Sequence, residues 1–223
     1  MIYGNPTHKH VLAVKNSILV REWSRLGVFD TLKNAPYPNE EMTQQELLYM
    51  VELQRDVDST RLERINLYDE FLYETMVEFL ASYGVTSTVE ELKQKLDVYE
   101  PVIDYLKMLY NRPRPFQAAG MYGIPLYPLL ERVTGDGSSS YPSGHTLLAL
   151  LFRHFYMKSH PELSKELMRF AMDVKKSREE GGVHYPSDGL FSMRIYKHLA
   201  LWIDAQIKVY EDLTNSMVTD ILK

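Results

Sequence analysis

Residues 177–188 read SREEGGVHYPSD, a stretch that holds an arginine, a histidine and an aspartate within twelve residues. His184 and Asp188 are four residues apart, so a helix that begins near Pro186 brings the carboxylate one turn back toward the imidazole. Proline suits a first helical turn because its missing N–H would have no partner there. Asp188 can then accept the Nδ1 proton of His184, which leaves the Nε2 lone pair free for nucleophilic attack.

Arg178 adds an anion-binding group to the same stretch. Gly181 and Gly182 lie between it and His184, and they allow a turn tight enough to bring the guanidinium to the same point. A structural explanation is also open, because a histidine and an aspartate beside a helix start are commonly a helix cap and a surface histidine. Two segments upstream bear on which explanation holds.

The segment SYPSGHT at 140–146 predicts a loop that turns into a helix, since its proline suits the first helical position and an apolar run follows at 147–151. Ser143, Gly144 and His145 then lie in the first turn, where free backbone N–H groups and the helix dipole favour an anion. Gly144 has no Cβ, so a phosphate oxygen can approach the main chain closely. The structural alternative is a capped helix that happens to contain a glycine and a histidine.

The segment KMLYNRPRP at 107–115 holds Lys107 and Arg114 seven residues apart, which on a helix is two turns and one face. The prolines on both sides of Arg114 make the end of this segment extended and restrict its backbone, so the guanidinium is held at a smaller entropic cost. Basic side chains near a helix C-terminus also have a structural use, because they stabilise the helix dipole.

Taken in order, the patterns K-x6-R-P, P-S-G-H and S-R-x5-H-x3-D resemble the three-part signature of the type 2 phosphatidic acid phosphatase superfamily, over residues 107–188. This superfamily holds lipid phosphate phosphatases, bacterial class A non-specific acid phosphatases and vanadium-dependent haloperoxidases. The stretches KMLYNRPRPF, SSYPSGHT and GVHYPSD are most similar to the class A enzymes. The resemblance implies an all-α fold, a single-domain helical bundle of the acid phosphatase and vanadium haloperoxidase type.

The resemblance also implies a phosphatase that hydrolyses phosphomonoesters through a phosphohistidine intermediate and can extend to phosphotransfer. His184 would attack phosphorus, Asp188 would orient His184, and His145 would protonate the departing alkoxide and later deprotonate the attacking water. Fixed cations and N–H groups would hold the three phosphate oxygens, so no metal or other cofactor is expected. The phosphate-binding residues would be Lys107, Arg114, Ser143, Gly144 and Arg178.

Two other functions remain open. In a vanadate-dependent haloperoxidase the same pocket would hold vanadate as a prosthetic group ligated by His184, whereas a phosphatase would be inhibited by vanadate. A binding or structural protein that kept the fold is the third class.

The phosphatase mechanism needs His145 protonated and His184 neutral at the start. This need predicts two separated pKa values and a bell-shaped pH profile of activity with an acidic optimum.

Composition supports one domain and a local anion site. The chain has 223 residues, 45% of them hydrophobic, which is enough for one sizeable core. Its net charge of -5 gives no general attraction for nucleic acid or anionic membranes, so we expect a small-molecule phosphate ester as partner. The absence of cysteine excludes disulfides and thiolate chemistry. A homodimer or higher homo-oligomer is compatible with these features.

The N-terminal residues show no signal-peptide pattern, and no window approaches eighteen consecutive apolar residues. We therefore expect a cytoplasmic or otherwise soluble protein without a membrane span. This departs from the class A enzymes, which are typically periplasmic. A second departure is the pair Glu179 and Glu180 directly after Arg178, which we expect to face solvent as part of a hydrated loop.

The helical pattern suggests how one domain is laid out. We expect an N-terminal arm and loop (1–40), scaffold helices (41–100), catalytic motifs (101–190) and a C-terminal helix (191–223). Predicted helices cover 13–26, 42–83 with a division near Asp58, a segment from Thr88, a restart at Pro101, and 126–132, 142–158, 161–176 and 186–213. The long irregular stretch 111–140 is predicted to form a wall of the site. His8, His10, His154, His160 and His198 belong to no motif, so a structural or surface role is expected for them.

Overall fold

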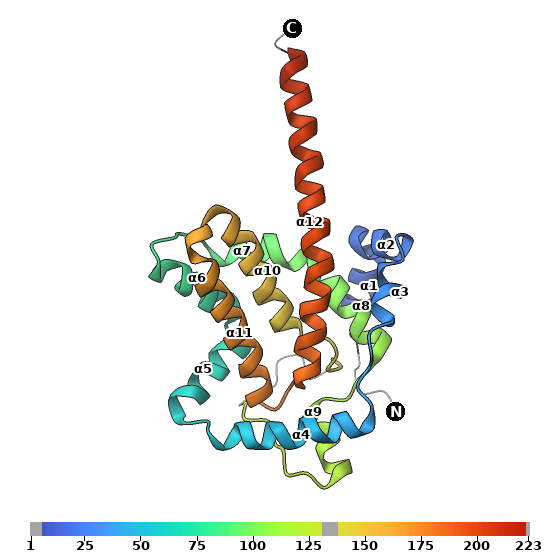
Figure 1. The fold of residues 1–223 in the computed structure, drawn as a ribbon, viewed down its shortest axis with the longest axis vertical. Helices are drawn as coiled ribbons and strands as arrows, with labels where there is room; N and C mark the ends of the chain where they lie inside the picture. The colour runs from blue at the N-terminus through green and yellow to red at the C-terminus, as the bar shows by residue number, and fades with distance from the viewer. Residues whose placement is uncertain (1–5, 131–137, 222–223) are drawn as a thin grey trace.

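The computed structural model describes residues 6–130 and 138–221, with side chains as far as residue 209. Within these ranges the chain is helical and contains no strand (Figure 1), which confirms the all-α prediction. The first half holds α1 (His8–Asn16), α2 (Ile18–Arg25), α3 (Val28–Lys33), α4 (Glu40–Arg55), α5 (Ser59–Glu70), α6 (Leu72–Ser82), α7 (Val89–Leu96) and the 3-10 turn η1 (Asp97–Tyr99). The second half holds α8 (Glu100–Tyr110), α9 (Pro115–Ala119), η2 (Gly120–Tyr122), α10 (Gly144–Ser159), η3 (Pro161–Leu163), α11 (Ser164–Glu180) and α12 (Pro186–Ile221).

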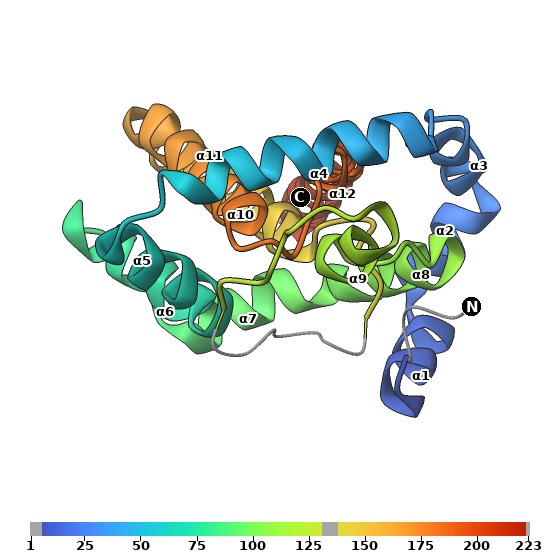
Figure 2. The same cartoon turned by 90° about the horizontal axis from the view of Figure 1, so that it is seen from below.

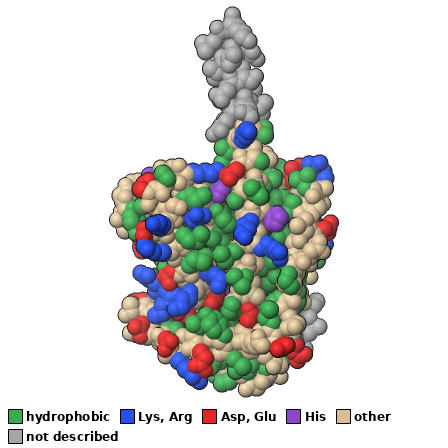
Figure 3. Space-filling model, in the orientation of Figure 1, with side chains coloured by type: hydrophobic (Ala, Val, Ile, Leu, Met, Phe, Trp, Pro, Cys, Tyr) green, Lys and Arg blue, Asp and Glu red, His purple; other side chains and the backbone are tan. Residues whose placement is uncertain are grey.

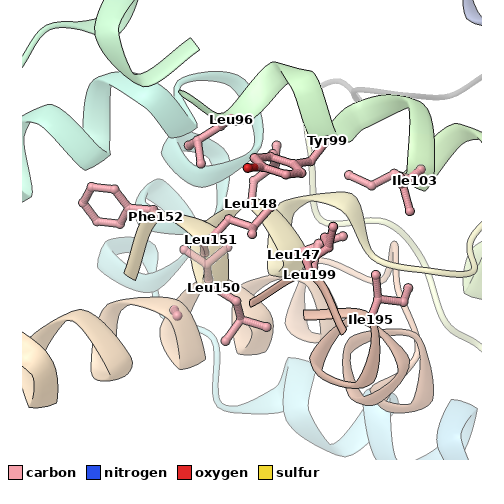
Figure 4. Packing of buried hydrophobic residues seen from close by; sticks show 14 of the residues in the cluster. Leu96, Tyr99, Ile103, Leu147, Leu148, Leu150, Leu151, Phe152, Ile195 and Leu199 are labelled. Carbon is pink, nitrogen blue, oxygen red and sulfur yellow. The ribbon is translucent and has the colours of Figure 1, made fainter. Parts of the chain in front are cut away.

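Helix α10 is the centre of the bundle. Its residues from Thr146 to Phe152 are all buried, so the helix is apolar on every side instead of on one stripe. It packs mainly against α11 and α12. Figure 4 shows its leucines between side chains of α12, such as Ile195 and Leu199, and side chains of η1 and α8, such as Tyr99. Each fully buried leucine of this kind contributes about 1.5–3 kcal/mol.

Helix α4 closes one end of the bundle. Figure 2 shows it running across the ends of α10, α11 and α12, while α7 and α8 lie on the opposite side. Leu47 and Met50 bury its inner face, in a small core that also includes Tyr185 at the start of α12. This placement brings polar side chains of α4 next to the beginning of α12.

Helix α12 is longer than predicted and extends beyond the body of the molecule (Figure 1). The sequence predicted an end near Leu213, but the helix continues to Ile221. On the face drawn in Figure 3, apolar side chains are interspersed with lysines and arginines along this helix. Leu201 on α12 is 72% exposed.

Several predicted helix boundaries are confirmed. Thr88 and Glu91 form the expected capping box, with Thr88 N donating to Glu91 Oε2 at 2.9 Å. Pro101 lies in the first turn of α8, where it restarts the helix after η1. A division near Asp58 is also found, because its side chain accepts from Arg61 N at 2.7 Å and caps α5.

Other boundaries were wrong. The predicted helix 13–26 belongs to two helices joined at Ser17, whose side chain caps α2. A second division falls at Phe71, where the backbone leaves the helical region (φ −129°, ψ 42°) without a glycine or proline to signal it. The part of the predicted helix 126–132 that the structure describes, residues 126–130, is not helical, and 131–132 lie outside the described residues. Helix α11 continues past Lys176 to Glu180.

Candidate active site

A cavity of about 220 Å³ lies where the three sequence segments meet. Ser138 also borders it, as do the half-buried Asp104 and the exposed Glu100 of α8. Asp188 and Ser143 are not among the residues that line it and lie behind its wall. The predicted site residues on the wall itself are Lys107, Arg114, Gly144, His145, Arg178 and His184.

The imidazole of His184 is held from both sides. Its Nδ1 lies 3.1 Å from Oδ2 of Asp188, one helical turn away, and its Nε2 lies 3.0 Å from Nη1 of Arg114. A guanidinium can only donate, so Nε2 accepts in this arrangement and Nδ1 carries the proton that Asp188 accepts. Burial, with the nearby charge of Arg114, holds the pKa of His184 well below its usual range. The ring is therefore neutral at neutral pH, with its Nε2 lone pair directed toward a cation.

Asp188 is completely buried in a network of donors. Its Oδ2 accepts hydrogen bonds from Ser140 Oγ and, at 2.9 Å, from the backbone N–H of Tyr185. Its Oδ1 accepts from Nη1 of Arg112 at 2.6 Å. Burial raises the pKa of Asp188, and the charge of Arg112 opposes that rise.

Arg112 was missed by the sequence reasoning, which assigned a role only to the second arginine of the R-P-R-P run. Its Nη2 donates to Glu46 Oε2 at 3.0 Å, and its guanidinium carbon lies 3.7 Å from the centre of the Tyr185 ring. Glu46 on α4 also accepts from the backbone N–H of Ser187 at 2.6 Å. The pair Arg112 and Glu46 thus ties α4 and the start of α12 to Asp188. No local pattern marks Glu46, because it lies in a different helix.

On the other side of the cavity, Asp69 joins Arg178 and His145. Arg178 Nη2 donates to Asp69 Oδ1, and the backbone carbonyl of Asp69 lies 3.3 Å from His145 Nε2. Burial, followed by the charge of Arg178, lowers the pKa of His145 to about 3. Asp69 sits on α5, outside every motif, so the sequence contained no signal for its role.

Arg178 still has unused donors. The residue is 1% exposed, and its Nε and Nη1 have no hydrogen-bond partner in the described part of the chain. Buried polar groups without partners are uncommon in folded proteins and call for an explanation. Because Arg178 lines the cavity, an anion bound there would supply the missing acceptors.

The remaining predicted phosphate ligands differ in their placement. Lys107 Nζ and Arg114 Nη2 each donate to Ser138 Oγ at 3.0 Å, and burial lowers the pKa of Lys107 well below its usual range. Gly144 lies on the wall, and a Cβ there would meet only Ile103 at an ordinary 3.6 Å. Ser143 caps α10 by accepting from Thr146 N, and its own backbone N–H is directed to the carbonyl of Asp188 at 3.4 Å. Its N–H is thus already engaged within the protein.

The expectation that Glu179 and Glu180 face solvent was wrong. Each is 4% exposed, because α11 continues through them. Lys175 pairs with Glu179, and Arg61 Nε donates to Glu180 Oε2 at 2.6 Å. Neither carboxylate forms an ion pair with Arg178 within the described chain, so neither competes with an anion for it.

Two further expectations concern the cavity wall. The irregular stretch 111–140 does contribute Arg114 and Ser138 to the wall, while residues 131–137 lie outside the described part. His10, for which only a structural or surface role was expected, also lines the cavity.

In the described chain no group of three histidine, aspartate or glutamate side chains is arranged to hold a metal ion. Likewise, none of its described helices is long and apolar enough to cross a bilayer.

The fold is similar to that of a solved transmembrane PAP2-type phosphatidylglycerolphosphate phosphatase from Bacillus subtilis. The two structures superpose with a TM-score of 0.52, over 82% of this chain and 96% of that chain, at 20% sequence identity. No protein-family model and no curated protein matches the sequence. At this identity the comparison establishes a shared all-α fold, in agreement with the prediction.

Proposed function

We propose that this chain, which has the fold of a PAP2-type phosphatase, is a phosphatase of the type 2 phosphatidic acid phosphatase superfamily. It hydrolyses phosphomonoesters through a phosphohistidine on His184 and needs no metal. The observation that carries the proposal is the buried guanidinium of Arg178, which lines a cavity shared with His145 and His184 and has two N–H groups without a partner in the described chain.

Binding comes first. The phosphate accepts from Arg178 Nε and Nη1, and Arg114 supplies further positive charge on the same wall. Burial lowers the pKa of Lys107 in the empty site, and the bound anion favours its charged form. Arg114 now donates to His184 Nε2, so a phosphate that takes over this donor frees the lone pair for attack. Three fixed cations around one small group match the charge that spreads over the equatorial oxygens during phosphoryl transfer.

The reaction then proceeds in two chemical steps. His184 Nε2 forms a bond to phosphorus while the ester P–O bond breaks, and His145 gives its proton to the departing alkoxide. Water next attacks phosphorus, His145 takes its proton, and the P–N bond to His184 breaks to release inorganic phosphate. Asp188 accepts the Nδ1–H of His184 throughout and stabilises the positive charge that the ring acquires.

His145 must carry a proton before the first step, although its pKa is lowered to about 3 in the empty site. A phosphate dianion beside it favours the protonated ring and opposes the effect of Arg178. The substrate therefore brings the charge that makes His145 an acid.

The test is turnover of p-nitrophenyl phosphate by the full chain in the presence of EDTA, with rapid quench of a radiolabelled phosphoenzyme under alkaline conditions. We expect metal-independent release of phosphate, inhibition by vanadate, and loss of both turnover and label in His184→Ala. His8→Ala, which changes an exposed histidine outside the cavity, is the matched control. Wild-type turnover by His184→Ala would reject the nucleophile, and vanadate-dependent halide oxidation without ester hydrolysis would establish the haloperoxidase instead.

A further inference from the structure

The cavity has a second end with the opposite charge. Helix α8 contributes Lys107 to the phosphate end and also Asp104 and Glu100 to the same wall. These carboxylates come three and seven residues before Lys107, which on a helix is about 4.5 Å and about 10 Å along the axis. The charge of the side chains on this face of α8 therefore changes from positive to negative over a distance that a small molecule can span.

Neither carboxylate has a direct ion-pair partner, although the charges of Lys107 and His10 lie near Asp104 and that of Lys9 lies near Glu100. Asp104 and Glu100 form no hydrogen bond and no ion pair within 4 Å in the described structure. Reduced hydration beside the cavity, with the nearby charges of Asp97 and Asp104, raises the pKa of Glu100 to about 7, although its side chain remains exposed and Lys9 opposes the rise. Burial raises the pKa of the half-buried Asp104, and His10 and Lys107 oppose that rise. Two carboxylates that face one cavity without a direct ion-pair partner favour a bound cation.

The opposite end points independently to an anion. There the buried Arg178 holds two N–H groups without a partner, in the same cavity of about 220 Å³. Ile103 and Leu148 add an apolar part to the same wall, against which a short carbon chain can pack. The lining thus combines an anion site, an apolar surface and acidic side chains in one cavity.

We infer that the substrate is the phosphomonoester of an amino alcohol, with its phosphate at Arg178 and its ammonium group between Asp104 and Glu100. This inference rests on the proposed phosphatase activity and specifies its substrate class. Asp104 and Glu100 act as specificity residues that attract a cationic leaving group. They repel leaving groups that carry a carboxylate or a further phosphate.

The experiment compares three esters of similar size that differ only in the charge of the leaving group. These are O-phosphoethanolamine (cationic), ethyl phosphate (neutral) and 2-phosphoglycolate (anionic). For the wild-type chain we expect kcat/KM to fall in that order, by roughly fivefold or more at each step at low ionic strength, with smaller differences at high salt. In Asp104→Asn and in Glu100→Gln we expect the kcat/KM values of the cationic and the anionic ester to move toward that of the neutral ester, so that their ratio falls toward one.

The ratios are taken within each variant, so partial loss of folded protein does not affect them. Glu74→Gln removes an equal charge from an exposed position on α6 and is expected to keep the wild-type ratios. Equal kcat/KM for all three esters, or unchanged ratios in both cavity variants, would overturn the inference and leave the phosphatase proposal standing. No turnover of these esters or of p-nitrophenyl phosphate would reject the phosphatase proposal and the inference together.

Discussion

Arg112 Nη1 lies 2.6 Å from Oδ1 of Asp188, so the carboxylate that accepts the proton of His184 is itself held by a buried cation. Arg112 is 2% exposed and Asp188 is fully buried. Both charged groups are shielded from water. Arg112 has a second ion-pair partner in Glu46, whose Oε2 lies 3.0 Å from Nη2 of Arg112. The orientation of His184 therefore depends on a chain of contacts that begins on α4.

Arg112→Met should strongly destabilise the protein and reduce turnover. It leaves the carboxylates of Asp188 and Glu46 buried without their partner, a change that typically costs about 3–5 kcal/mol. Denaturant unfolding measures the stability, and kcat for p-nitrophenyl phosphate measures the effect on His184. Arg55→Met removes an arginine whose ion pair with Glu52 is exposed, and it should cost less than about 1 kcal/mol. Similar losses in both variants would contradict the role of Arg112.

Asp69→Asn should weaken phosphate binding. Asp69 holds Nη2 of Arg178 and thereby directs Nε and Nη1 toward the cavity, so a neutral amide leaves this buried guanidinium less well oriented. We expect kcat/KM to fall by about tenfold or more, the loss typical when a charged hydrogen bond is weakened. The inhibition constants of phosphate and vanadate should rise in parallel. Asp56→Asn, at an exposed position, serves as the control, and an unchanged inhibition constant in Asp69→Asn would refute this role.

The pH dependence of stability should report the buried state of His145. Its folded pKa is about 3, whereas a histidine in the unfolded chain has a pKa of about 6.5. Between these values the unfolded chain binds more protons, so the contribution of His145 to stability is fully present above about pH 6.5 and is lost as the pH falls toward 3.

The measurement is the free energy of unfolding at pH 7 and pH 4.5, for the wild type and for His145→Asn. The wild type should lose about 2–3 kcal/mol more than the variant over this range, because the variant lacks the group that titrates. Bound vanadate should reduce the difference, since an anion favours the protonated ring. Parallel losses in the two proteins would show that His145 is not shifted in the folded state.

Gly182→Ala should destabilise the turn before His184 more than a positive φ alone explains. Gly182 has φ +75°, and a Cβ there would lie 2.8 Å from the backbone oxygen of Tyr127, which cannot move aside easily. Gly84 has a similar φ of +73° but nothing within 4 Å of an added Cβ. We expect Gly84→Ala to cost about 1–2 kcal/mol and Gly182→Ala about 3 kcal/mol or more. Equal unfolding free energies for the two variants would contradict the close approach.

The relation between His184 and Asp188 could be predicted from the sequence because it is local. Two residues four apart at a helix start can meet across one turn, and the structure places them 3.1 Å apart. The capping box at Thr88 and the restart at Pro101 were predictable for the same reason. In each case the spacing of a few residues within one element determines which groups can touch.

The environment of the cavity could not be predicted in this way. Arg112 and Arg114 each stand before a proline in one short run, yet one lies behind the wall on Asp188 and the other lines the cavity beside His184. Asp69 and Glu46 reach the site from α5 and α4, and neither has a sequence pattern that sets it apart from other acidic residues.

The sequence by itself therefore determined the helical class and the local geometry of the three motifs, since backbone preferences and short spacings act within a few residues. Only the tertiary structure decided which charges are buried together and which donors in the described chain lack an acceptor, such as Nε and Nη1 of Arg178 on the cavity wall. Burial and pairing depend on how distant helices pack, and the packing of α4, α5 and α8 around α10, α11 and α12 sets those partners.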